Sequence, residues 1–161
     1  MEWEKPLLHG NFCLWKPIVR NLSMWTSLPP VCRPLDLKER PCVQGESCLQ
    51  EIHQRIQRGD SFAFETTLSG RSYAQSIPQW RATDYHVKLI FLSLPTVEIA
   101  IARVASRVAQ GGHAVAEDVI RRRFDSGLRN FHNLYNRIVD SWILCDNSGL
   151  VPRQIACGDN P

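Results

Sequence analysis

Beyond residue 36, the apolar residues of the chain alternate between helical spacing and short continuous runs. Helical spacing marks one apolar face of an amphipathic helix, and a short apolar run bounded by turn residues is typical of a buried strand. The elements predicted in this way, in chain order, are a helix at 50–58 that stops at Gly59, a strand at 61–66, a helix at 71–81 that ends near Pro78, a strand at 86–94, a helix that begins after Thr96 and breaks at 110–113, a long helix from 117 to 138, and a strand at 141–145.

This alternation predicts an α/β fold. Strands that alternate with helices imply crossover connections, a parallel sheet and helices on both faces of that sheet. Three strands are few for such a sheet. We therefore expect a parallel sheet with flanking helices that is incomplete at the amino terminus.

The first 34 residues differ from the rest of the chain. They hold three of the five tryptophans and five of the ten prolines, and no apolar period persists there for more than a few positions. We expect residues 1–35 to form an irregular, non-native segment and residues 36–161 to form one domain.

Composition limits the functional class only weakly. Apolar residues make up 43% of the chain and charged residues 22%, and the formal charge of +3 suits a small anionic ligand. No apolar run approaches the roughly 20 residues that span a bilayer, and the amino terminus does not resemble a signal peptide, so we expect a cytoplasmic location without a membrane partner. The six cysteines form no CxxC pair and no zinc spacing, so no metal site is predicted.

Polar residues follow each predicted strand. In an open parallel sheet, ligands bind outside the carboxyl ends of the strands. The residues at these ends lie in three groups, which are Glu65 to Gly70, Ser93 to Pro95, and Asp146 to Gly149.

Three stretches of sequence resemble the bacterial zeta-toxin-type P-loop kinases. They are SFAFETTLSG at 61–70, IARVASRVAQGGHAVAEDVIRRRFDSGLRNF at 101–131, and VDSWILCDNSG at 139–149. The order, spacing and length of these stretches all fit, over about three quarters of the chain. The resemblance implies a P-loop NTPase-like fold and an ATP- and Mg²⁺-dependent phosphotransferase, whose founding family members act on a nucleotide-activated amino sugar.

The resemblance also assigns site residues. Glu65, Thr66 and Thr67 would line the acceptor pocket, where a carboxylate and hydroxyls can hold a sugar hydroxyl for in-line attack. The alternative is that these residues end a strand and cap the next helix. Asn147 would lie near the nucleotide base, although an asparagine before a glycine turn needs no ligand to explain it.

Three arginines are candidates for phosphate binding. Arg103 and Arg107 lie one turn apart on a helix and could neutralise a transferring phosphate, and one of Arg121 to Arg123, taken as Arg122, could add a third guanidinium. The alternative is a solvated basic face paired with neighbouring carboxylates, which we favour for at least two members of the triplet. His113 follows two glycines in a segment suited to a lid over the phosphates, or in a simple surface turn.

The phosphate loop that such an enzyme needs is absent. No GxxxxGK[ST] sequence and no base carboxylate at the end of a second strand occurs in residues 1–60. A shifted reading frame could explain this. When the codons of Met1 to Pro6 are read starting from the third base of each codon, they can encode Gly-Val-Gly-Lys-Thr, and the genetic code fixes both glycines. Read in the same way, the codons of Met24 to Thr26 must encode Val-Asp.

The favoured function is that of a zeta-toxin-like kinase that is inactive because its phosphate loop is missing. Two other functions are alternatives. One is a non-catalytic remnant or binding module that uses its basic helices for an anionic partner. The other, ranked last, is nucleic-acid binding through the arginines. The expected partners of the kinase are a small-molecule phosphate acceptor and an antitoxin protein, with no nucleic acid.

Overall fold

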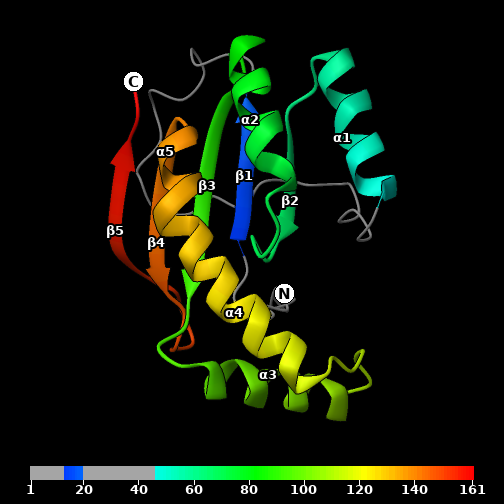
Figure 1. Cartoon of the computed structure of the whole chain (residues 1–161), viewed down its shortest axis with the longest axis vertical. Helices are drawn as coiled ribbons and strands as arrows, with labels where there is room; N and C mark the ends of the chain where they lie inside the picture. Colours follow the sequence, from blue (N-terminus) through cyan, green and yellow to red (C-terminus); the bar gives the residue numbers. More distant parts are fainter. Residues whose placement is uncertain (1–12, 20–45) are drawn as a thin grey trace, which may run out of the picture.

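The computed structural model describes residues 13–19 and 46–161, which form a mixed five-stranded sheet flanked by helices (Figure 1). The strand order across the sheet is β2-β1-β3-β4-β5. The strands are β1 (Cys13–Val19), β2 (Phe62–Thr66), β3 (His86–Ser93), β4 (Ser141–Asp146) and β5 (Arg153–Asp159).

The helices lie close to their predicted positions. They are α1 (Glu46–Arg58), α2 (Ser72–Ala82), α3 (Val97–Ala109), α4 (Glu117–Asn130), the π-helical turn η2 (Phe131–Tyr135) and α5 (Asn136–Ile138). The predicted long helix is therefore a rod of three parts, with a wide turn before its end. Helix α2 does not end near Pro78, as the sequence suggested, because Pro78 lies inside it and the helix runs on to Ala82.

The sheet is mixed, so the prediction of a parallel sheet is corrected. Strands β3 and β4 pair in parallel, whereas β1 is antiparallel to both β2 and β3, and β5 is antiparallel to β4. A connection of only six residues joins β4 to β5, and strands joined so closely pair as an antiparallel hairpin. Strand β5 was not predicted, because its residues show no apolar alternation and most of them are exposed.

Strand β1 lies within the segment expected to be irregular, and it occupies the position between β2 and β3 in the sheet. It fits that position imperfectly. Pro17 has no N–H group to donate, and the pairing shifts register around it on both the β2 side and the β3 side. The other calls on residues 1–45, including the shifted frame, lie outside the described residues.

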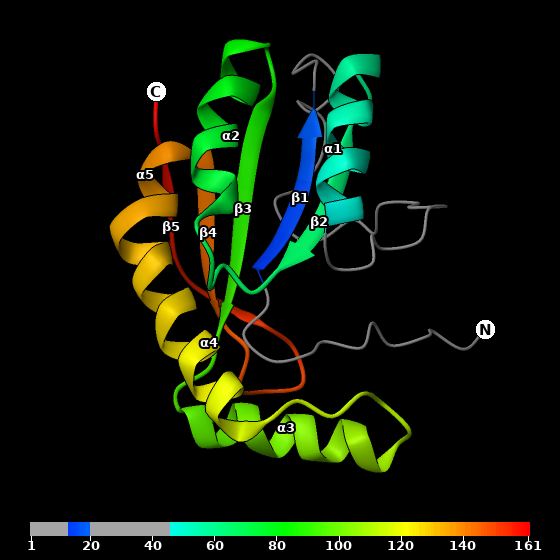
Figure 2. The same ribbon diagram turned by 45° about the vertical axis from the view of Figure 1, so that its right-hand side comes forward.

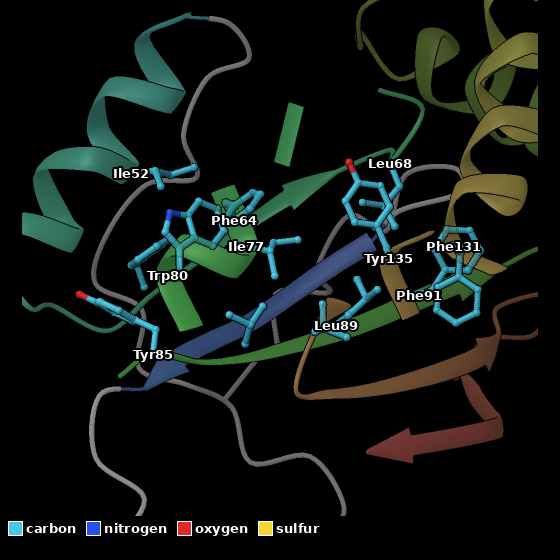
Figure 3. Close-up of a cluster of buried hydrophobic side chains, with 13 residues drawn as sticks. Ile52, Phe64, Leu68, Ile77, Trp80, Tyr85, Leu89, Phe91, Phe131 and Tyr135 are labelled. Carbon is cyan, nitrogen blue, oxygen red and sulfur yellow. The ribbon is translucent and has the colours of Figure 1, made fainter. Parts of the chain in front are cut away.

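One hydrophobic core covers one face of the sheet. Alternate residues of β3, namely Val87, Leu89 and Phe91, are fully buried there, and the ring of Phe91 stacks on that of Phe131 with the centroids 4.7 Å apart (Figure 3). Helix α1 adds Ile52, helix α2 adds Ile77 and Trp80, and η2 adds Phe131 and Tyr135. Helices on both faces were expected, but the helices that form this core all pack on the same face (Figure 2).

Helix α3 lies apart from that core, across the end of the sheet (Figures 1 and 2). A second, smaller cluster holds it there. In this cluster Leu94, directly after β3, packs with Ala100 of α3 and Ile120 of α4. The arginines of α3 are therefore carried to the edge of the sheet where β3 ends.

Candidate functional site

The carboxyl ends of β2, β3 and β4 meet at one edge of the sheet. Because β2 and β3 are each antiparallel to β1, they are parallel to each other, and β4 is parallel to β3. The polar residues that follow these strands therefore lie along one edge, the edge that α3 crosses (Figure 1). We define this edge, with α3, as the polar edge.

Asn147 is the most deeply buried polar residue at the polar edge. Its backbone N–H donates to the Ser93 carbonyl at 2.8 Å, which ties the end of β4 to the end of β3. Its side chain is 2% exposed, and its Nδ2 has no hydrogen-bond partner. A buried amide that donates no hydrogen bond costs free energy, so it indicates a place where a ligand atom could accept one.

Asp146 shapes the turn that carries Asn147. The backbone N–H of Ser148 donates to Asp146 Oδ1 at 2.9 Å, and Arg153 lies 3.5 Å from the other carboxylate oxygen. The hydrogen bonds from Ser148, with a smaller effect of Arg153, hold the pKa of the Asp146 carboxyl below its usual value. Asp146 therefore stays ionised, and its charge keeps the turn closed under Asn147.

Arg103 reaches the same turn from α3. Its Nη2 donates to the Asn147 carbonyl and, at 3.5 Å, to the Ser148 carbonyl. The structure thus brings together two of the residues predicted from the sequence, Arg103 and Asn147. Among the described residues, these bonds go to backbone carbonyls and no carboxylate pairs with Arg103, so its charge is available to an anion.

Arg107 contacts the segment that joins α3 to α4. Its Nη2 donates to the His113 carbonyl at 2.9 Å, and its Nε is buried without a partner. The aliphatic part of Arg107 lies so close to Gly112 that a Cβ there would come within 2.5 Å of Arg107 Cγ. Gly112 therefore allows Arg107 to hold the segment before α4 against α3.

The loop after β2 has its own hydrogen bonds. The Thr67 and Ser69 hydroxyls are 2.9 Å apart, and the backbone N–H of Leu68 donates to Thr66 Oγ1 at 3.3 Å. Glu65 is exposed at the end of β2, and Thr66 and Thr67 are half-buried. The structure shows no direct bond between this loop and Arg103 or Asn147, so the predicted acceptor and nucleotide residues share an edge but not a contact.

Within the described part of the chain, ion pairs are shown for one member of the arginine triplet. Arg121 lies 2.7 Å from Glu117 and 3.2 Å from Glu98, in an exposed network. Arg122 is exposed on α4 and forms no ion pair with the described part of the chain, so its predicted phosphate contact stays a prediction.

Two residues that hold the β2 loop, one on α4 and one on η2, were not among those predicted from the sequence. Asn130 is 6% exposed and donates to the Leu68 and Ser69 carbonyls, and Tyr135 donates to the Gly70 carbonyl. A signal existed, because Asn130 lies three residues after Gly127 and four before Leu134, within the apolar stripe of the predicted long helix.

Two classes of site find no support in residues 13–19 and 46–161. These residues contain no group of three or more histidine, cysteine or acidic side chains that could hold a metal ion. No helix in the same ranges has both the length and the apolar character needed to cross a membrane.

Comparison with known proteins gives one similar sequence of unassigned function. An uncharacterized protein of Haemophilus influenzae is 34% identical over 80 residues, which cover 50% of this chain and 57% of that protein. No protein-family profile matches the chain, and no solved structure matches it.

Proposed function

We propose that this chain is a truncated ATP-dependent phosphotransferase of the zeta-toxin type, with a P-loop NTPase-like arrangement of β2, β3 and β4. One observation carries the proposal. Asn147 Nδ2 is buried without a hydrogen-bond partner, and Arg103 donates to the backbone carbonyl of the same residue, at the edge where three mutually parallel strands end. Asn147 could donate a hydrogen bond to a base, and Arg103, which contacts the same turn, could neutralise phosphates. This combination suits a nucleotide.

The proposed roles come from the resemblance to the zeta-toxin-type kinases. Asn147 donates to an acceptor atom of the nucleotide base, Arg103 and Arg107 neutralise phosphate charge, and Glu65, Thr66 and Thr67 bind the acceptor. ATP would supply the phosphoryl group, and Mg²⁺ would bridge its phosphates. Because residues 1–60 contain no GxxxxGK[ST] sequence, we propose that the chain binds nucleotide without catalysing transfer.

The position of β1 supports a lost phosphate loop. A strand parallel to β2 and β3 in that position would end at the polar edge, where a Gly-rich loop could reach the phosphates. Strand β1 runs the opposite way, carries a proline and shifts register on both sides. The proposed shift of reading frame explains this mismatch. The nucleotide sequence of the gene tests it, because an intact upstream Gly-rich loop with no insertion or deletion near the codons for Pro34 and Leu35 would refute it.

The nucleotide site is tested by titrating the purified chain with MgATP in a calorimeter. We expect measurable binding that is lost in Asn147→Leu and in Arg103→Met. The matched controls are Asn133→Leu and Arg129→Met, because both residues are exposed on the α4–η2 rod. Equal affinity in the control and site variants would refute the proposal. Binding of many unrelated anions with the same affinity would instead favour the anionic binding module.

A further inference from the structure

Three consecutive carbonyl groups of the β2 loop are held by one helical rod. Asn130 Nδ2 donates to the Leu68 carbonyl at 2.8 Å and to the Ser69 carbonyl at 3.2 Å, which uses both of its hydrogens. Tyr135 Oη donates to the Gly70 carbonyl at 2.9 Å. The loop from 67 to 70 is therefore fixed by contacts more than 60 residues away in the chain.

The loop that these bonds hold has a strained conformation. Leu68 has a φ of 51°, a left-handed conformation that is unfavourable for a leucine. Its side chain is nevertheless 1% exposed within the main core. Strain of this kind persists where the surroundings determine the conformation, and it is common where a loop binds a ligand.

Helix α4, the first part of the rod, approaches this loop closely. A Cβ at Gly127 would lie 2.6 Å from the Thr67 carbonyl oxygen, so the absence of a side chain lets α4 come close. The π-helical turn begins directly after Asn130. In a regular α-helix, residues five apart point about 140° away from each other. The wider turn, with its i to i+5 bonding, brings Tyr135 round to the side of Asn130.

We infer that Asn130 is the positioning residue of an acceptor-binding loop, with Gly127 and Tyr135 as its supports. This inference rests on the proposed function, because that function makes the loop the acceptor site. Since the rod binds the carbonyl groups of Leu68 to Gly70, the hydroxyls of Thr67 and Ser69 stay in one arrangement, 2.9 Å apart. A fixed pair of hydroxyls suits a hydroxyl-rich acceptor such as a sugar, because a preorganised site loses less entropy on binding.

The test replaces one side chain by an isostere of opposite hydrogen-bonding character. In Asn130→Asp, carboxylate oxygens would face the two carbonyl oxygens and repel them. The matched control is Asn133→Asp, an exposed position three residues further along the rod. Each protein is measured for amide hydrogen exchange at 67–70, for binding of glucose, a hydroxyl-rich sugar without base or phosphate, as the acceptor probe, and for binding of MgATP.

We expect Asn130→Asp to exchange the loop amides at least about tenfold faster and to bind the probe about tenfold more weakly, with unchanged MgATP affinity. The control should match the wild-type chain in all three measurements. A selective loss of probe binding separates positioning from general damage to the fold, because general damage would also weaken MgATP binding. Should Asn130→Asp fail to fold, Tyr135→Phe removes a single bond to the loop and should change the same two measurements by less.

Several outcomes overturn the inference, and they differ from failure of the proposed function. Unchanged exchange or unchanged probe affinity in Asn130→Asp overturns it, as does equal loss of probe and MgATP binding. Absence of probe binding by the wild-type chain also overturns it. If the wild-type chain binds the probe in an Asn130-dependent way but does not bind MgATP, the positioning role stands and the phosphotransferase proposal fails.

Discussion

At the scale of single residues, three helices end in the same way, although only two of these ends were visible in the sequence. Gly59 and Gly111 have positive φ after α1 and α3, and each of these helices closes with the two hydrogen bonds of a Schellman motif. Helix α2 closes with the same two bonds, from Asp84 to Arg81 and from Tyr85 to Trp80, but the left-handed residue is Asp84. Glycine marks such a position in a sequence, whereas aspartate does not.

Asp84→Gly should therefore stabilise the protein. Asp84 is exposed with a φ of 64°, so the change relieves strain, and the higher entropy of glycine in the unfolded chain offsets part of the gain. We expect the free energy of unfolding in urea to rise by up to about 1 kcal/mol. The matched control is Asp60→Gly, at an exposed position without positive φ, which should lower it. A loss of stability in Asp84→Gly would contradict this reading of the helix end.

Gly127→Ala should have the opposite effect. The new methyl group would lie 2.6 Å from the Thr67 carbonyl oxygen, so either α4 or the β2 loop must move. We expect a loss of about 1–3 kcal/mol in urea unfolding, because overpacking of a close contact strains the backbone. Gly149→Ala is the control, because its Cβ would meet its nearest atom at 3.8 Å. Equal stability of the two variants would show that α4 does not press on the loop.

At the scale of elements, apolar runs that pack in the core could be predicted, and exposed strands could not. The patterns at 61–66, 86–94 and 141–145 correspond to β2, β3 and β4. Buried residues alternate along most of β2 and β3, and every residue of β4 is buried or half-buried. Strand β5 has mostly exposed residues, and its register shifts near Ile155, so no periodic signal marks it. Strand β1 contains a proline, which argues against a strand inside a sheet. The π-helical turn could not be predicted for another reason, because its apolar residues are spaced as they are in an ordinary α-helix.

Pro78→Ala should stabilise α2. Pro78 is exposed inside the helix, where it cannot donate to the carbonyl four residues earlier. We expect the free energy of unfolding to rise by about 1–3 kcal/mol, since proline inside a helix costs about 3 kcal/mol relative to alanine. In the matched variant Pro152→Ala, outside any helix, stability should fall slightly, because proline restricts the unfolded chain. If Pro78→Ala instead destabilised the protein, the ring would have a packing role that its exposure does not suggest.

At the scale of the whole molecule, the candidate site depends on strands whose order in space differs from their order in the sequence. The sequence could indicate that polar residues follow three strands, because each strand has its own local pattern. It could not show that β1 would enter between β2 and β3, nor that Asn130 would reach back to Leu68, because these contacts join distant parts of the chain. The common direction of β2, β3 and β4 nevertheless brings the predicted residues to one edge.

The proposed function depends most on nucleotide binding at the polar edge. Amide chemical shifts of the isotope-labelled chain, recorded during titration with MgATP, test this directly. We expect changes at Ser93, Asn147, Ser148 and Arg103, and none at His86 and Ser141, which begin β3 and β4 at the opposite edge. Changes confined to His86 and Ser141, or no change at saturating MgATP, would contradict the account.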